Sequence, residues 1–353
     1  MRYRCRMAAR TSSADTTFTG LSLAALSEAL GSRTRALAAR RWLSAARPVP
    51  TALPERIAGV APAAWADLRT AAPMLPWRLV ERTVSVDGTI KYALDVGGAT
   101  IETVLIPADN RSTVCVSSQS GCTRKCVFCA TATLGFGRQL KAGEIVLQYL
   151  VAQSEAPADA PARNVVFMGM GEPLDNLDEV LPAIDRLIEP PAPRLGAGHI
   201  TVSTSGVLPG IQRFLREGRG HLALSLNATT DAVRETLMPH NRQWPIGDLL
   251  EALRADQRRG SGRRYFIEYV LWDGVNDSAD DGRRLIALLE GLNAHVNLIP
   301  HNPFDGNPYR PSPEETVRRF QKQLLDGGVR ALVRQPRGRE IAAACGQLAR
   351  LKS

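Results

Sequence analysis

The sequence contains no run of about 18 apolar residues, which is the minimum for a transmembrane helix. The stretch from Met1 to Thr17 also lacks the apolar segment of a secretory signal. We therefore expect a cytoplasmic protein without a membrane anchor, and we interpret residues 1–19 as a disordered leader. The 353 residues, 44% of them hydrophobic, are enough for one large domain with a small appendage.

Cysteine is scarce, with six residues in the whole chain. A chain of this length does not need disulfides for stability, and without a secretion signal we expect its thiols in a reducing compartment. Three of them, Cys122, Cys126 and Cys129, are crowded into one short segment. This crowding indicates metal binding or catalysis. Cys5 fits no pattern, and we treat it as an incidental thiol.

Lysine is also rare, so arginine carries almost all of the positive charge. The formal net charge is +9 and the isoelectric point is about 9.6. A basic surface suits a polyanionic partner such as nucleic acid. Ala and Arg are abundant throughout the chain, however, so compositional drift explains the same charge, and charge alone does not establish RNA binding.

Hydrophobic periodicity divides the rest of the chain into three regions. Helical spacing interrupted by prolines predicts a small helical domain over residues 20–76. Alternating residues separated by Gly turns predict a three-stranded antiparallel extension over residues 77–107. From residue 108 to 349, β-branched runs alternate with helical patterns, which predicts an α/β fold with a parallel sheet, open or closed into a barrel. Such folds carry their chemistry on the loops that follow the strands.

The individual elements follow from the same patterns. The strands predicted after residue 108 are 113–117, 164–168, 199–204, 221–226, 265–271, 294–299 and 329–333. The helices predicted between them include 142–154, 177–188, 245–259, 279–292 and 313–326.

The three crowded cysteines have the spacing Cys122-x3-Cys126-x2-Cys129, directly after a predicted strand. Three thiolates in one loop can hold three irons of a [4Fe–4S] cluster and leave the fourth iron open. The alternative is zinc, which needs a fourth ligand, usually from a second pair of Cys or His residues. The sequence has no such pair, because its histidines stand alone, so we favour the cluster.

Further motifs surround this loop. They are, in order, Cys115-Val-Ser-Ser-Gln-Ser-Gly-Cys122, Gly135-Phe136, Gly169-Met-Gly-Glu-Pro173, Ser203-Thr-Ser-Gly206, Asn297-Leu-Ile-Pro-His-Asn-Pro303 and Ala344-Cys345-Gly-Gln-Leu348. The three-cysteine loop resembles that of the radical S-adenosylmethionine (SAM) superfamily. Together the motifs resemble the RlmN/Cfr family of RNA adenosine methyltransferases, from about residue 80 to residue 349.

The resemblance implies a partial (βα)6 radical SAM barrel with a small helical N-terminal domain and an antiparallel β extension. It implies one [4Fe–4S] cluster held by the three loop cysteines, and two SAM molecules per turnover. One departure is Asn227, where many members have His after Ser-Leu. The cofactor contacts that the resemblance implies are Gly171, Glu172, Ser203, Ser225, Leu226, Asn227 and Asn302.

The resemblance also implies catalytic roles for two cysteines and one carboxylate. Cys345 would take a methyl group from one SAM, and a radical from a second SAM would activate that methyl group for addition to the base. Such a carrier is needed because the adenine carbon between two ring nitrogens is too electron-poor to attack SAM itself. Cys115 would help to remove the ring proton and to release the product, which leaves a Cys115–Cys345 disulfide for reduction, and Glu102 matches the family's proton acceptor.

The implied substrates are an adenosine of 23S rRNA in the peptidyl transferase centre and, in dual-specificity members, the tRNA adenosine just 3′ of the anticodon. The RlmN branch methylates ring carbon C2 and the Cfr branch methylates C8, and the Gly-Met-Gly-Glu-Pro and Ser-Thr-Ser-Gly motifs look more like RlmN. We also expect an electron donor such as flavodoxin, and a monomer. The expected RNA contacts are Arg124, Lys125, Phe136, Arg138 and residues 334–339.

Two other interpretations stay open. The chain could be a non-catalytic RNA-binding protein with a structural cluster, or a radical SAM enzyme that acts on a protein or a small molecule. Intact Cys115, Cys345 and Glu172 disfavour the first, and the paired Cys115 and Cys345 disfavour the second.

Overall fold

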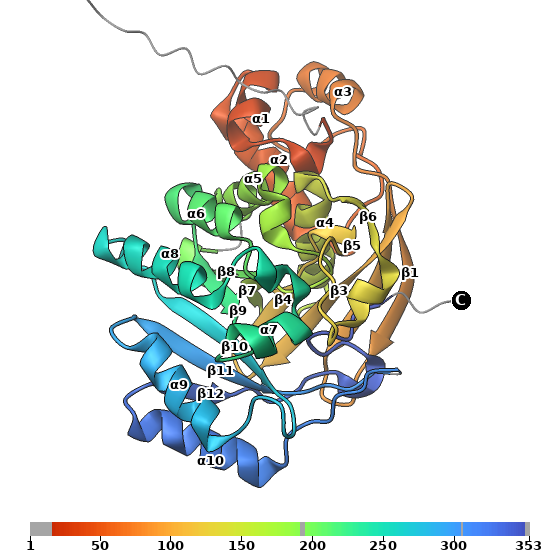
Figure 1. Ribbon diagram of the computed structural model, residues 1–353. Coiled ribbons are helices and arrows are strands. Elements are labelled where there is room, and N and C mark those ends of the chain that lie inside the picture. The colour runs from red at the N-terminus through yellow and green to blue at the C-terminus, as the bar shows by residue number, and fades with distance from the viewer. Residues whose placement is uncertain (1–15, 191–194, 305, 350–353) are drawn as a thin grey trace, which may run out of the picture.

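The computed structural model describes residues 16–190, 195–304 and 306–349. In this part of the chain, ten strands form one sheet in the order β1-β2-β3-β4-β7-β8-β9-β10-β11-β12. Strands β1 to β4 are antiparallel neighbours, and β4 and β7 to β12 run parallel (Figure 1). The strands are β1 Trp77–Val84, β2 Ile90–Val96, β3 Ala99–Ala108, β4 Arg111–Cys115, β7 Ala162–Phe167, β8 Ile200–Thr204, β9 His221–Ser225, β10 Tyr265–Leu271, β11 Ala294–Pro300 and β12 Arg330–Val333.

Helices connect the parallel strands and follow one another around the outside of the curved sheet (Figure 1). Because β1 and β12 are its two edges, the sheet is a partial barrel, as predicted. A separate two-stranded sheet, β5 Gln119–Gly121 and β6 Phe136–Gln139, flanks the three-cysteine loop. The helices are α1 Leu23–Ala29, α2 Arg33–Ala45, α3 Pro62–Ala71, α4 Ala142–Ser154, α5 Leu177–Ile188, α6 Leu208–Glu217, α7 Asp231–Leu237, α8 Ile246–Arg258, α9 Ala279–Leu289 and α10 Glu314–Asp326.

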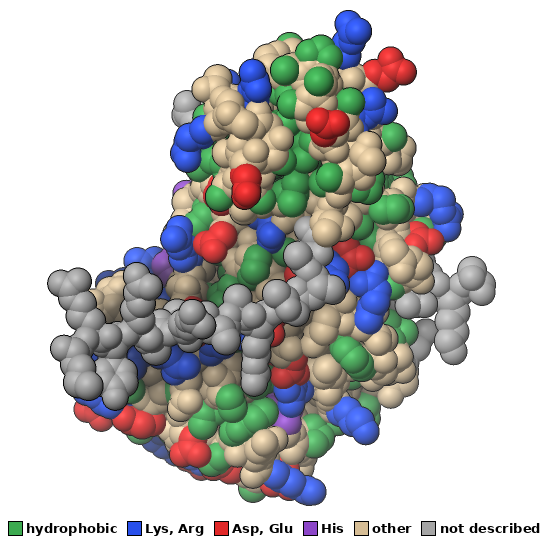
Figure 2. Space-filling model, turned by 90° about the horizontal axis from the view of Figure 1, so that it is seen from above, with side chains coloured by type: hydrophobic (Ala, Val, Ile, Leu, Met, Phe, Trp, Pro, Cys, Tyr) green, Lys and Arg blue, Asp and Glu red, His purple; other side chains and the backbone are tan. Residues whose placement is uncertain are grey.

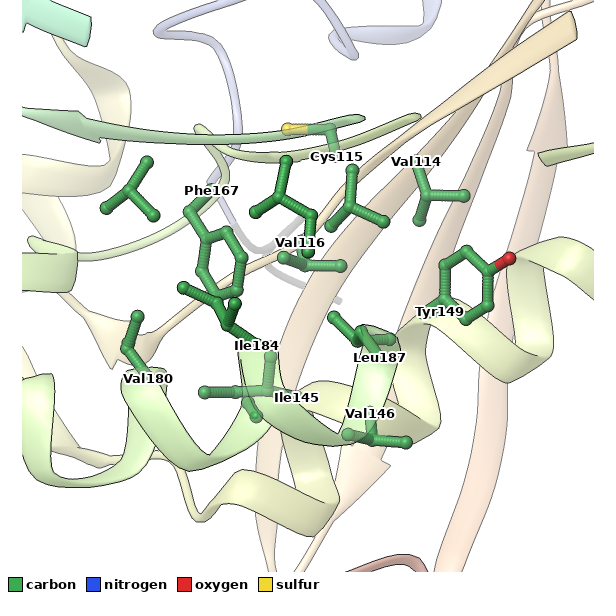
Figure 3. Packing of buried hydrophobic residues seen from close by; sticks show 14 of the residues in the cluster. Val114, Cys115, Val116, Ile145, Val146, Tyr149, Phe167, Val180, Ile184 and Leu187 are labelled. Carbon is green, nitrogen blue, oxygen red and sulfur yellow. The ribbon is translucent and has the colours of Figure 1, made fainter. Parts of the chain in front are cut away.

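The core between sheet and helices is apolar. Figure 3 shows side chains of β4 and β7 packed over those of α4 and α5, with Val116 and Phe167 directed toward the helices. Helix α4 is buried along almost its whole length, because it has the sheet on one side and the N-terminal helices on the other. The described helices include none that is long and apolar enough to cross a membrane.

The N-terminal helices are anchored to the barrel. The Arg40 guanidinium forms an ion pair of 2.9 Å with Glu189, the residue after α5. The same carboxylate accepts a hydrogen bond from the Leu23 amide. Phe18 is buried and makes edge contacts with Trp42 and Trp65. The predicted disordered leader over residues 1–19 is therefore too long at its end, because Phe18 and Thr19 pack into the helical domain. Residues 1–15, which include Cys5, lie outside the described part of the chain.

Candidate active site

A cavity of about 280 Å³ opens at the carboxyl ends of the parallel strands. It brings together residues that are as far apart in sequence as Cys115 and Cys345. Most of the site residues predicted from the sequence line it: Cys115, Cys122, Cys126, Cys129, Gly171, Glu172, Ser203, Ser225, Asn227, Asn302 and Cys345. Two predicted residues, Glu102 and Leu226, lie outside its wall.

The three-cysteine loop is held by backbone hydrogen bonds to distant segments. The Cys122 amide donates to Gly135 at 2.9 Å, and the Val127 amide donates to Leu237 of α7 at 3.0 Å. Gly121 precedes the loop with φ +86°, and a Cβ there would collide with the Gly135 carbonyl. The loop therefore needs glycine at this turn.

The chemistry of the three thiols fits an iron–sulfur cluster. Burial raises the pKa of Cys126 well above its ordinary value, and the neighbouring Cys129 and Cys122 raise it further. Three thiolates this close need positive charge between them, which iron provides. A structural zinc ion needs four ligands, and the loop supplies three cysteines. In a [4Fe–4S] cluster each thiolate binds its own iron, so the loop fits the cluster better.

Gly171 and Glu172 follow β7 in a turn that only glycine fits. Gly171 has φ +100°, and a Cβ there would lie 2.6 Å from the Cβ of Gln119. The Glu172 carboxylate accepts hydrogen bonds from the amide and hydroxyl of Ser205 at 2.8 and 2.7 Å, and from the Leu174 amide at 3.1 Å. Burial raises the pKa of Glu172, and the Ser205 hydrogen bonds act against this. The carboxylate is therefore fixed in the cavity wall.

The ends of β8 and β9 supply the next part of the wall. Ser203 and Ser225 lie near the carboxyl ends of these strands and face the cavity. Asn227 has φ +61°, a left-handed conformation that Asn tolerates better than most residues, and its Oδ1 accepts the Val270 amide at 2.9 Å. Leu226 is fully buried outside the cavity, and its amide donates to the carbonyl of Glu268.

Cys345 reaches the cavity on a C-terminal segment, residues 338–348, that several elements hold in place. Asn302 donates to the Cys345 carbonyl at 3.4 Å, and its Oδ1 accepts from Arg339 at 3.1 and 3.2 Å. Immediately after the three-cysteine loop, the Ala130 amide donates to the Gly346 carbonyl and the Thr131 hydroxyl to the Leu348 carbonyl. The segment is thus docked directly on the cysteine loop.

The thiols of Cys345 and Cys115 influence each other across the cavity. Cys345 is solvent-accessible where it lines the cavity, whereas Cys115 is buried. Burial raises the pKa of Cys115, and a charge on Cys345 would raise it further. Burial also raises the pKa of Cys345, as does the Glu268 carboxylate, whereas the Arg334 guanidinium lowers it. The two thiols predicted to react together thus face the same cavity.

Glu102 lies on β3, behind the cavity wall. Its Oε1 pairs with Nζ of Lys91 at 3.0 Å, and both side chains are about 2–3% exposed. Burial raises the pKa of Glu102, and Lys91 lowers it. Lys91 also donates to the carbonyl of Ala342, three residues before Cys345. The ion pair therefore borders the C-terminal segment.

Three residues of the site were not predicted from the sequence. Ser205 anchors Glu172, Glu268 faces the cavity from β10 with its Oε1 bonded to Asn297 at 2.8 Å, and Arg234 lies fully buried on α7. Ser205 stands in the recognised Ser-Thr-Ser-Gly motif, so its position was a usable signal. Arg234 and Glu268 stand in no recognised motif.

The predicted RNA contacts differ in solvent exposure and in whether their charges are already paired. Lys125 and Phe136 are exposed, and Arg334 is exposed at the cavity. Arg124 instead pairs with Asp175 and lies over the Trp244 ring. The Arg138 guanidinium donates two hydrogen bonds of 2.7 Å to the Glu144 carboxylate, so its charge is already balanced within the protein. On the face seen in Figure 2, basic and acidic side chains are interspersed, and no single basic patch stands out.

Known proteins resemble this chain over most of its length. The Radical SAM superfamily matches residues 116–286. The dual-specificity RNA methyltransferase RlmN of Paracoccus denitrificans is 46% identical over 281 residues, which cover 76% of this chain and 72% of the relative. A probable RNA methyltransferase of Sorangium cellulosum is 45% identical over 307 residues, 86% of this chain and 77% of the relative.

A solved structure gives the same answer for the fold. The crystal structure of a radical SAM methyltransferase from Sphaerobacter thermophilus superposes with a TM-score of 0.87 at 41% identity, covering 94% of this chain and 98% of that one. A [4Fe–4S] cluster and SAM are the cofactors of the radical SAM superfamily, and the three-cysteine loop fits them. The chain therefore belongs to the RlmN family of radical SAM RNA methyltransferases.

Proposed function

We propose that this enzyme adds a methyl group to C2 of an adenosine in 23S rRNA and in tRNA, using Cys345 as the methyl carrier. One observation carries the proposal: Cys345 and Cys115 line the same cavity as the three-cysteine loop and Glu172. The relatives named dual-specificity RNA methyltransferase RlmN support both RNA substrates.

Cys122, Cys126 and Cys129 would hold the cluster, and Glu172 with the ends of β8 and β9 would hold SAM. When bound, the cluster supplies the electron that cleaves SAM to a carbon radical. The protein supplies position and exclusion of water. Glu172 is suited to this because its carboxylate is already oriented by Ser205 and Leu174.

Cys345 must lose its proton before it accepts a methyl group, because the thiolate is the nucleophile. Arg334, exposed at the cavity, favours that charge. After the methyl carbon has joined the base, and the adduct has returned the electron used to cleave SAM and lost its ring proton, the Cys115 thiolate would attack the sulfur of Cys345. The bond from that sulfur to the methyl carbon breaks, the carbon keeps the electron pair and takes up a proton, and an external dithiol reduces the Cys115–Cys345 disulfide. Glu102 lies behind the cavity wall, paired with Lys91, and would receive the ring proton by way of Cys115 rather than directly from the base.

Turnover would consume two SAM molecules, one as methyl donor and one as radical source. An electron donor such as flavodoxin and a monomeric state remain predictions.

The test is an anaerobic reaction of the reconstituted protein with SAM, a reductant and unmodified 23S rRNA or tRNA, followed by mass spectrometry of the nucleosides. We expect 2-methyladenosine in both RNAs. The C8 isomer would assign Cfr-type chemistry instead, and cleavage of SAM without a methylated base would mean that the substrate is another molecule.

Two variants complete this test. Cys345→Ala is expected to abolish methylation while cluster absorbance and RNA binding remain. Cys5→Ala, at a cysteine outside every recognised motif, is the matched control and is expected to retain activity. Methylation by Cys345→Ala at the wild-type rate would contradict the carrier role.

A further inference from the structure

Arg234 is a buried cation with only neutral partners. Its side chain on α7 has no exposed surface. Nε donates to the Leu226 carbonyl at 2.9 Å, Nη1 to Oδ1 of Asn241 at 2.7 Å, and Nη2 to the carbonyls of Ser205 and Ser225 at 2.6 and 3.0 Å. Each of these acceptors is an uncharged oxygen.

A buried charge without a charged partner is costly, so an anion is expected nearby. Burial lowers the pKa of Arg234 to about 10, which still leaves the side chain positive at neutral pH. Asp231 acts on it only at longer range, and the Asp231 Oδ1 is already bonded to the Asn241 side chain and the Ile246 amide. Most of the compensation must come from elsewhere.

Cys126, like Asp231, would stabilise the Arg234 cation when negatively charged, and it carries that charge as the thiolate ligand of the proposed cluster. Cys126 packs against Leu237 and Met238, at the end of the same helix α7. The Val127 amide, next to Cys126, donates to the Leu237 carbonyl at 3.0 Å. Helix α7 therefore fixes the guanidinium and the cysteine loop relative to each other.

The same guanidinium joins the ends of two strands that line the cavity. Ser205, whose carbonyl it binds, holds Glu172 through its amide and hydroxyl. Ser225 ends β9 within the cavity wall. Gly206 leaves room for this arrangement, since a Cβ there would lie 2.9 Å from Nη2 of Arg234.

We propose that Arg234 is a positioning residue whose buried charge balances the thiolate-bound cluster and makes the cluster easier to reduce. The proposal rests on the cluster assignment made above. The net charge and the surroundings of an iron–sulfur cluster set its reduction potential. Because reduction adds one negative charge, a fixed cation beside Cys126 stabilises the reduced form more than the oxidised form. Removing the charge should shift the potential to more negative values.

The experiment compares wild type with Arg234→Gln, Arg234→Lys and Arg263→Gln, each with its cluster reconstituted anaerobically. Arg263 is the matched control, because it also donates to backbone carbonyls, those of Gly218 and Gly220, but at the other end of β9. The readouts are the reduction potential from an EPR-monitored titration, the iron content, and the melting temperature of the protein without its cluster.

We expect a more negative potential for Arg234→Gln and a potential near that of wild type for Arg234→Lys and Arg263→Gln. Equal potentials in Arg234→Gln and wild type would overturn the inference, as would equal negative shifts in Arg234→Gln and Arg263→Gln. If Arg234→Gln does not fold, Arg234→Lys decides: it keeps the charge without the fork of hydrogen bonds, so a marked negative shift would overturn the inference. A wild-type protein that binds no cluster would instead refute the proposed function.

Discussion

Replacing Gly171 by Ala tests whether the turn before Glu172 has the geometry described. At φ +100° a residue with a side chain is strained by roughly 1–3 kcal/mol. The added Cβ would lie 2.6 Å from Cβ, 2.7 Å from Cγ and 2.8 Å from the amide nitrogen of Gln119. Overpacking of this kind costs about 1–3 kcal/mol. Together, we expect a loss of about 2–6 kcal/mol in the free energy of unfolding.

The same change should also reach the cofactor site. The Glu172 amide donates to Oε1 of Gln119 at 2.9 Å, so a displaced Gln119 removes one support of Glu172. Urea unfolding measures the stability, and calorimetry measures SAM binding to the reconstituted protein. We expect both to be weakened in Gly171→Ala.

Gly247→Ala is the matched control. Gly247 lies in helix α8, and a Cβ there would meet no atom within 4 Å. In a helix, Ala is favoured over Gly by roughly 0.5–1 kcal/mol, so this variant should be slightly stabilised. The reasoning fails if Gly171→Ala unfolds within about 1 kcal/mol of wild type and binds SAM normally.

Three further substitutions test other parts of the site. Lys91→Met leaves the Glu102 carboxylate buried without its partner and should lower the free energy of unfolding, measured in urea, by about 3–5 kcal/mol. The double variant Lys91→Met with Glu102→Leu should recover most of this loss. Wild-type stability in Lys91→Met alone would contradict the buried pair. Burial lowers the pKa of His240 to about 4, so the unfolded chain binds a proton that the folded protein excludes, and stability falls as the pH drops from about 6.5 toward 4. His240→Gln can still donate to the Ser205 carbonyl and should lose less stability over that interval, as compared by urea unfolding at about pH 7 and about pH 4.5; an equal loss in both proteins would show that His240 does not contribute. Cys115→Ala should retain methyl transfer from SAM to Cys345, seen as a mass increase of the Cys345 peptide, but should fail to release methylated RNA, and normal product release would refute its role.

Regular elements of the barrel follow from local sequence patterns. Helices α4 and α5 and strand β10 have the predicted bounds. The apolar residues of α5 recur with a helical period, whereas α4 and β10 are nearly continuous apolar runs of helix and strand length. Helix α6 was not among the predicted helices, since Pro209 and Gly210 at its start are typical of loops. Strand β3 runs to Ala108, one residue beyond the predicted end of the antiparallel extension at residue 107, because pairing with β4 continues to that point.

The site residues divide along similar lines. Those in recognised motifs, such as Glu172 and Cys345, could be named from sequence. The burial of Arg234 and the ion pair between Lys91 and Glu102 could not be predicted from the sequence, because each depends on contacts between separate elements. The register of β2 and β3 puts Lys91 directly opposite Val104. Glu102 precedes Val104 by two residues and lies on the same face of β3, so the Lys91 side chain reaches it diagonally.

The docking of the C-terminal segment has a consequence for the order of assembly. Thr131 donates a hydrogen bond to the carbonyl of Leu348, which lies 217 residues later in the chain. The three-cysteine loop therefore leaves the ribosome long before Cys345 does. Strands β4 to β11 can fold in that interval, since the chain emerges from its N-terminus onward. The cavity is then still open beside Ala130, where the segment later binds. Synthesis therefore leaves a period in which iron and sulfide can reach the loop, and the arrival of the C-terminal segment ends it.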